Sequence, residues 1–367
     1  MTGSELQCNN ILIDYFFKEF VYRDLYFYKG KQKQELCDGL VEFQDAYVVF
    51  QIKEKRKSTA QDWLQKKVYK KAVHQIKETI AMLQDGNVIQ VESYTDEKVI
   101  LDTKKKILPV IIFDSDDRNY KQIHTSSQEK DLRINVFSMC DFKKVLESIS
   151  IPYDIVLYLE MRSAFFESTF PDLFINNINE TMTSLAKIEN EDGLLDYYIA
   201  MKNGNKFIDD NALEGFRFII KSFQERLLDG ELYNKKEYKE TLKYLLKSNR
   251  NTIQDFMLRW QMCVEHCMKK EETMHHFLID TGNEVGYLYI TETSIIEEYE
   301  YIKFILQLFK YKFKLGTVVG VLFNMINNED YTVEWILISS ENVYDEQFER
   351  ILEEENPWSN IKQLQIY

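Results

Sequence analysis

The sequence predicts a mixed α/β protein in which two regions that combine helices and strands flank a helical middle region. Short apolar runs with a period of two predict strands, and apolar residues at helical spacing predict helices. Between residues 179 and 270 only the helical pattern occurs. A chain of 367 residues is also longer than one hydrophobic core usually serves. We therefore expect three domains, at residues 1–140, 141–272 and 273–367.

The first domain is expected to open with a helix over residues 10–28, followed by a β-hairpin. After a turn at residues 44–46, a Val/Ile/Phe-rich run alternates up to Lys53. Side chains two apart in a strand share a face, so Gln51 and Lys53 project together. Asp38 lies near the start of the paired strand, and we expect the hairpin to bring it close to both.

The remaining elements follow from the same two periodicities. For the first domain we expect a helix over residues 61–83, a hairpin of 87–93 and 98–103, and strands at 107–113 and 134–137. For the middle region we expect helices at 141–148, 154–166, 182–201, 211–228, 236–246 and 252–269. The last domain reads ββαββα, with elements at 276–280, 285–290, 294–312, 318–324, 333–339 and 344–353. We expect this last domain to sense a signal, to oligomerise or to bind a partner.

The hairpin carries the residue types that metal-dependent phosphodiester hydrolysis needs. That reaction uses a hard cation that binds a phosphate oxygen and lowers the pKa of a water. Magnesium takes oxygen ligands, usually only one or two carboxylates. Asp38 offers a carboxylate, and the Gln51 amide offers a neutral oxygen. Lys53 can orient the water or stabilise charge in the transition state.

These residues resemble the restriction-endonuclease-like, or PD-(D/E)XK, nucleases, over roughly the first third of the chain. The resemblance rests on Glu35, Leu36, Asp38, Leu40 and Val41, followed by Gln51-Ile52-Lys53. Two positions depart from the pattern, because Cys37 stands where a proline usually precedes the aspartate and Gln51 stands in an acidic position. The second departure leaves open a degenerate, inactive copy.

The resemblance implies an αβββαβ core and a nuclease that uses Mg²⁺ or Mn²⁺ to cut DNA, in bacterial defence against foreign DNA. It implies Asp38, Gln51 and Lys53 as catalytic residues, with Glu19 joining Asp38 and Gln51 as a metal ligand. Glu35 and Gln75 are implied as supporting residues. Two alternatives stay open: an inactive nuclease fold that serves as an adaptor, and a nuclease directed at RNA.

The charge distribution is compatible with nucleic-acid binding by the first domain only. The whole chain carries a net charge of −14, yet residues 1–130 hold 21 basic and 20 acidic residues. Residues 50–77 hold nine basic against two acidic residues. Basic side chains of this kind give sequence-independent contacts to phosphates. We expect nucleic-acid contacts from Lys55, Arg56, Lys57, Lys66, Lys67, Lys70 and Lys71.

The sequence also indicates where in the cell the protein is expected. No apolar run reaches the length of a membrane span, and the N-terminus has no signal pattern, so we expect a cytoplasmic protein without membrane contact.

The sequence allows two alternative sites. A zinc site could be formed by Cys263, His266, Cys267, His275 and His276, but we favour buried thiols on a helix. Cys37 with His74 could be read as a nucleophile and base, but no third partner is identifiable.

Overall fold

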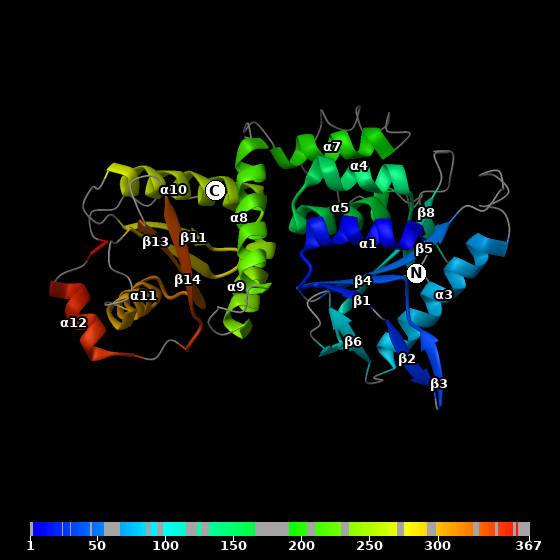
Figure 1. Cartoon of the computed structure of the whole chain (residues 1–367), viewed down its shortest axis with the longest axis horizontal. Helices are drawn as coiled ribbons and strands as arrows, with labels where there is room; N and C mark the ends of the chain where they lie inside the picture. The colour runs from blue at the N-terminus through cyan, green and yellow to red at the C-terminus, as the bar shows by residue number, and fades with distance from the viewer. Residues whose placement is uncertain are drawn as a thin grey trace. The chain divides into compact units, whose positions relative to one another are not determined.

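The computed structural model of the chain (Figure 1) contains two compact units, Met1–Lys206 and Phe207–Tyr367. We describe each unit by itself. The described residues are 3–23, 25–29, 31–44, 46–54, 67–85, 89–93, 98–114, 123–125, 132–165, 191–203, 210–228, 235–269, 275–291, 299–325, 330–341, 344–354 and 357–358.

The first unit is built on an eight-stranded mixed sheet with the strand order β7-β6-β1-β4-β5-β8-β10-β9. Strands β5, β8 and β10 are parallel to one another, and the other neighbours are antiparallel. A separate hairpin of β2 and β3 follows β1. The strands are β1 (Val21–Arg23), β2 (Tyr26–Lys29), β3 (Gln32–Glu35), β4 (Gly39–Phe43), β5 (Ala46–Glu54), β6 (Gln90–Ser93), β7 (Lys98–Ile100), β8 (Lys106–Asp114), β9 (Ile123–Thr125) and β10 (Arg133–Ser138).

Helices cover both faces of this sheet (Figure 1). Ile76 of α3 packs with Ile111 of β8 on one face. On the other face, Phe142 of α4 lies against Phe50 of β5, with ring centroids 5.7 Å apart. The helices of this unit are α1 (Gly3–Phe16), α3 (Lys67–Gln84), α4 (Met139–Ile149), α5 (Pro152–Phe165) and α7 (Glu191–Asn203). The connection between the parallel strands β5 and β8 contains α3 as well as β6 and β7, and parallel neighbours require a long crossover of this kind.

The predicted helix over residues 10–28 is wrong beyond Phe16. Helix α1 stops there because Phe17 adopts a positive φ of 65°, the left-handed conformation that commonly ends helices. The residues that follow form strands β1 and β2, rich in the aromatic and β-branched types that favour strands. The sheet thus gains β1, a strand that the sequence analysis did not predict.

The second unit is a four-stranded sheet with the order β11-β12-β13-β14, in which only β12 and β13 run parallel. Its strands are β11 (His275–Asp280), β12 (Val285–Thr291), β13 (Thr317–Met325) and β14 (Tyr331–Ile338). Its helices are α8 (Asp210–Leu228), α9 (Lys235–Lys247), α10 (Arg250–Lys269), α11 (Tyr299–Phe313) and α12 (Glu346–Glu354). The ββαββα order predicted for residues 273–367 matches these elements.

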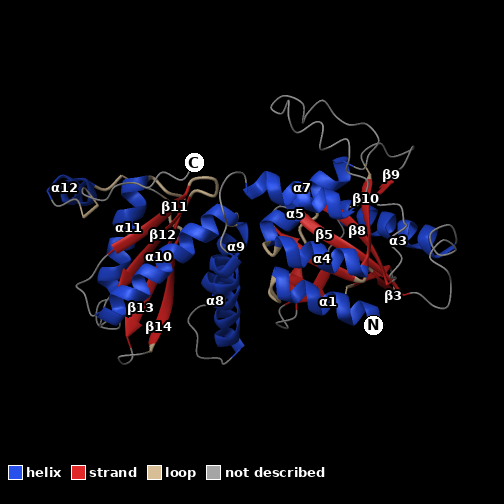
Figure 2. Cartoon of the chain, turned by 90° about the horizontal axis from the view of Figure 1, so that it is seen from above, coloured by secondary structure: helices blue, strands red, loops and turns tan. Residues whose placement is uncertain are grey.

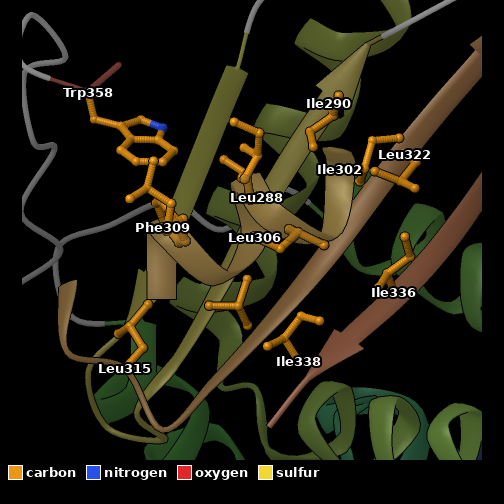
Figure 3. Packing of buried hydrophobic residues seen from close by; sticks show 13 residues of the cluster. Leu288, Ile290, Ile302, Leu306, Phe309, Leu315, Leu322, Ile336, Ile338 and Trp358 are labelled. Atoms are coloured by element: carbon orange, nitrogen blue, oxygen red, sulfur yellow. The ribbon is translucent and has the colours of Figure 1, made fainter. Parts of the chain in front are cut away.

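Helices α10 and α11 lie on opposite faces of the second sheet (Figure 2). On the α11 side, Leu288 and Leu322 point toward Leu306 of the helix, with Trp358 at the edge of the cluster (Figure 3). On the α10 side, Phe256 packs edge-on against Tyr287, with centroids 5.4 Å apart. The two sets of side chains alternate along the strands, so the sheet is buried on both faces.

The helices predicted as a separate middle domain are divided between the two units. Helices α4 and α5 lie on the first sheet, where Asn135 of β10 donates to the carbonyl of Leu159 in α5 at 3.2 Å. Helix α10 lies on the second sheet, where the Tyr289 hydroxyl donates to the carbonyl of Phe256 at 3.3 Å. The predicted boundaries at residues 140 and 272 therefore do not separate compact units. Among the described helices, none has the length and apolar character needed to cross a membrane.

Candidate functional site

The backbone around Asp38 is held between β5 and α1. The Asp38 N–H donates to the carbonyl of Phe50 at 3.1 Å, and Gly39 is the first residue of β4 to pair with β5. The Asn9 side chain on α1 donates to the Asp38 carbonyl at 3.2 Å. A Cβ atom on Gly39 would lie only 3.0 Å from Asn9 Oδ1. The absence of a side chain at Gly39 thus lets α1 approach the sheet directly beside Asp38.

One oxygen of Asp38 accepts hydrogen bonds from three consecutive residues of β5. Asp38 Oδ2 lies 2.6 Å from the Ile52 amide nitrogen and 3.3 Å from Lys53 Nζ, and it also accepts from Gln51 Nε2. Gln51 and Lys53 project from the same face of β5, as their spacing requires. The prediction that the hairpin brings Asp38, Gln51 and Lys53 together is confirmed.

The Asp38–Lys53 pair is largely withdrawn from solvent. The side chains of Lys53 and Asp38 are 16% and 4% exposed. Burial raises the pKa of Asp38, while the Lys53 charge and the Ile52 N–H lower it and the nearby Glu5 raises it further. When no cation is bound, the ionised form of Asp38 is therefore stabilised by hydrogen-bond donors of its own chain.

This raised pKa predicts a pH-dependent cost of keeping Asp38 ionised. The folded state holds the Asp38 proton more tightly than the unfolded state, whose pKa is near the ordinary value of 3.8. We expect the wild type to lose stability relative to Asp38→Asn as pH rises from 3.8 through the folded pKa, and the difference to stay constant above it. Urea unfolding of both proteins across this window measures the difference. If the wild type instead gains stability relative to Asp38→Asn over this window, the ion pair with Lys53 outweighs burial.

Two further carboxylates flank Asp38. Burial raises the pKa of Glu35, and the neighbouring charges of Asp38 and Glu5 raise it further, while Lys53 lowers it. Glu35 ends β3, and Glu5 lies in the first turn of α1. The supporting position predicted for Glu35 agrees with this arrangement. Glu5 was missed, although it precedes Cys8 and Asn9 by three and four residues and so shares their helix face.

The predicted role of Glu19 as a ligand beside Asp38 is wrong. The residue lies in the turn after α1, where the Phe20 carbonyl accepts from the Glu42 N–H at 2.8 Å. Glu42 is four residues beyond Asp38, which corresponds to about 13 Å along a strand. Glu19 is buried, with 3% exposure, at the other end of β4 from Asp38. The error arose because the predicted helix continued to residue 28 and therefore included Glu19. The helix ends at Phe16, so Glu19 lies in the turn that follows it.

Gln75 lies on the face of α3 that meets the sheet. One turn further along the helix, the Thr79 hydroxyl donates to the carbonyl of Leu36, two residues before Asp38. Helix α3 begins near the C-terminal end of β5, where Lys53 lies. Gln75 precedes Thr79 on this helix and is therefore nearer to Lys53 than Thr79 is. Its Oε1 is buried, and within the described structure it accepts no hydrogen bond. Gln75 thus offers an unused amide oxygen on this face of the sheet.

The basic residues predicted to contact nucleic acid are only partly described. Lys55, Arg56, Lys57 and Lys66 lie outside the described residues, and Lys67 is the first residue of α3. Lys70 and Lys71 are exposed on α3, the helix that packs over the Gln51 and Lys53 face of the sheet. The described part of the cluster is therefore accessible to a phosphate backbone.

The residue types at Asp38 suit a hard cation. Asp38 offers a carboxylate oxygen and Gln51 an amide oxygen, the ligand type that magnesium prefers, and the charges of Glu5 and Glu35 interact with that of Asp38. Among the described residues, no three His, Cys, Asp or Glu side chains are close enough to hold a metal ion together. Gln51 also presents its nitrogen to Asp38 in this arrangement. A cation could gain the Gln51 oxygen only after that amide turns over.

The rival nucleophile does not fit the structure. Cys37 is buried, and burial raises its thiol pKa well above the ordinary value, so the thiolate is disfavoured. His74 is exposed on α3, where its Nε2 lies 3.5 Å from Glu78 Oε1 one turn away. A buried, protonated thiol and an exposed histidine that lies beside Glu78 do not form the nucleophile and base of the proposed Cys37–His74 pair.

Comparison of the chain with protein-family models, with curated proteins and with solved structures found no match. The feature of this chain that bears most directly on function is the convergence of Asp38, just before β4, with Gln51 and Lys53 from the end of β5.

Proposed function

We propose that the first unit is a magnesium-dependent nuclease of the restriction-endonuclease-like type, acting on DNA. The observation that carries the proposal is the contact of Lys53 Nζ with Asp38 Oδ2 at 3.3 Å, formed by residues that follow the spacing of the resembled motif. The elements α1, β1, β4, β5, α3 and β8 support it, because they follow one another as αβββαβ once the inserted strands β2-β3 and β6-β7 are set aside. Neighbouring strands run β1-β4-β5-β8, with Asp38 before the second and Gln51-Ile52-Lys53 on the third.

Each residue of the site would have its own role in hydrolysis. A bound magnesium ion supplies a water of lowered pKa and neutralises charge on the scissile phosphate. Asp38 would hold the ion through a carboxylate oxygen, and Glu35 and Glu5 would add the negative potential that favours a cation. Gln51 would add a neutral oxygen. Lys53, released from Asp38 by the competing cation, would orient the water or stabilise the negative charge that develops on the phosphate.

DNA as the substrate is supported by charge. The acidic residues outnumber the basic ones beyond residue 130 by 40 to 25, whereas the chain around Lys53 and α3 is basic. Lys70 and Lys71 would contribute phosphate contacts without reading sequence. A role in bacterial defence against foreign DNA follows from the resemblance, and the second unit would restrain or trigger cleavage through oligomers or a partner protein.

Cleavage of supercoiled plasmid with Mg²⁺ or Mn²⁺ tests the proposal. We expect the wild type to nick or linearise plasmid only with a divalent ion, and Asp38→Ala to be inactive because the carboxylate that contacts Lys53 and would hold the ion is lost. Glu147→Gln is the matched control, since Glu147 is an exposed acid on α4 whose visible partner is Lys143. Equal cleavage by the wild type and Asp38→Ala would exclude the site. An RNA substrate of equal length distinguishes the RNA-directed alternative.

A second candidate function, a nuclease-like fold that binds DNA without cutting it, is favoured by the three donors that already satisfy Asp38 Oδ2. The two functions differ in their response to Gln51→Glu, which restores an acidic residue to the motif. For a weakly metal-binding nuclease, this variant should lower the magnesium concentration needed for half-maximal cleavage. For an adaptor, neither protein cleaves at any metal concentration, although both retard DNA in a gel.

A further inference from the structure

Two histidines of the second unit face each other between α10 and β11. His266 lies in the last turn of α10, and His276 is the second residue of β11. Their ring nitrogens, Nδ1 of His266 and Nε2 of His276, are 3.3 Å apart. The ring centroids are 5.1 Å apart and the ring planes are inclined by 31°. Both residues are partly exposed, so an ion can reach the pair from solvent.

This spacing matches that of two nitrogens on one tetrahedral ion. Zinc binds imidazole nitrogen at about 2.0–2.1 Å, so two such ligands at a tetrahedral angle are about 3.3–3.4 Å apart. We propose that His266 and His276 form a two-imidazole site for a borderline transition-metal cation such as Zn²⁺ or Cu²⁺. The remaining coordination positions would be open to water.

The surrounding contacts fix the pair before any ion binds. The Arg259 side chain on α10 donates through Nε to the carbonyl of Phe277, the residue after His276. Arg259 also donates to the carbonyl of Asp255 on its own helix at 3.0 Å. The first of these bonds joins the middle of α10, two turns before His266, to β11 directly beside His276. An ion would therefore bind without the cost of ordering two mobile elements.

The neighbouring cysteines do not join this site. Cys263 and Cys267 are free and buried in the α10 helix. In the described part of the chain, no three His, Cys, Asp or Glu side chains lie close enough to hold one ion, so the two sulfurs do not extend the histidine pair into a larger site. The structure thus separates the histidines from the cysteines that the sequence alone would have grouped into one zinc site.

Ligand chemistry sets the choice of ion. Imidazole suits zinc, copper and nickel, and affinities of divalent ions generally increase from manganese to copper. Magnesium prefers oxygen ligands, so it should not bind to this pair of imidazoles. An ion at this site would tie α10 to the edge strand β11, independently of the cation proposed beside Asp38.

Calorimetric titration of the untagged full-length chain with zinc chloride tests the proposal. We expect binding of one ion per chain and a rise in melting temperature with zinc, because a ligand of the folded state stabilises it. His266→Gln and His276→Gln should each weaken the affinity by roughly 100-fold or more, since the second ligand binds intramolecularly. His74→Gln, which changes an exposed histidine of the first unit, should leave the affinity unchanged.

Three outcomes would overturn the proposal: no zinc binding by the wild type, equal affinity in the two histidine variants, or loss of binding in His74→Gln. Cobalt substitution adds a test that does not depend on variants. Cobalt bound to two imidazoles and water gives no thiolate charge-transfer band, and Cys267→Ser should bind as the wild type does. A thiolate band would reject the two-imidazole site. Far-UV circular dichroism and melting of the metal-free variants show whether each is folded as the wild type is.

Discussion

Lys53→Met is expected to reduce DNA cleavage by roughly 100- to 1,000-fold, the usual loss when one group that stabilises transition-state charge is removed. The same change should strengthen metal binding. Lys53 Nζ lies 3.3 Å from Asp38 Oδ2, so the ammonium competes with a cation for the same carboxylate oxygen. Methionine keeps the unbranched shape and most of the length of the lysine side chain without its charge. Single-turnover cleavage at saturating magnesium measures the rate, and calorimetry with manganese measures the affinity.

The cleavage rate should fall while the metal affinity rises. These opposite changes distinguish the loss of a catalytic group from a general disturbance of the fold. A variant that merely disturbed the hairpin would lose rate and metal affinity together. Lys71→Met is the matched control, because Lys71 is exposed on α3 and has no place at the Asp38 oxygen. It should weaken DNA binding modestly and leave the single-turnover rate at saturating DNA unchanged. Unaltered cleavage by Lys53→Met would remove lysine from the mechanism.

The part of this site that the sequence predicts is the part fixed by short-range geometry. Asp38 and Lys53 belong to one hairpin, so strand alternation and a tight turn are enough to bring them together. Glu5 depends on how α1 crosses the sheet at Gly39, which no local pattern encodes. Glu19 was misplaced because the residues after Phe16 carry apolar side chains at spacings that fit either a helix or a strand, with no glycine or proline to mark the break.

The same distinction applies to the fold. The ββαββα order of the last hundred residues was predictable because turns separate its strands, and α11 shows a strong apolar face toward the sheet. The domain boundaries were not predictable, because an amphipathic helix does not specify which sheet it covers. Helix α5 joins the first sheet through Arg162, which donates to the carbonyl of Val136 in β10 at 2.8 Å. Such a long-range polar contact has no signature in a single sequence.

Glu191→Leu is expected to destabilise the first unit by about 3–5 kcal/mol, the usual cost of leaving a buried charge without its partner. Glu191 begins α7, and its carboxylate binds Arg162, whose side chain is fully buried, through contacts of 2.8–2.9 Å. The Tyr158 hydroxyl donates to the same carboxylate at 2.5 Å. Loss of the carboxylate removes this charged acceptor from the guanidinium, while the neutral acceptors Asn135 Oδ1 and the Val136 carbonyl stay in place. Urea unfolding followed by far-UV circular dichroism measures the loss.

The next residue supplies the control for this prediction. Asp192 pairs with Lys144 at 2.8 Å, but both side chains are substantially exposed, so Asp192→Leu should cost no more than about 1 kcal/mol. The double variant Arg162→Met/Glu191→Leu should cost less than the sum of its single changes, because no charge is then left buried alone. Hydrogen exchange of peptides from β10 and α5 should accelerate in Glu191→Leu and not in Asp192→Leu. Equal costs for the two leucine variants would mean that Arg162 reaches solvent when its partner is removed, so that burial no longer penalises its charge.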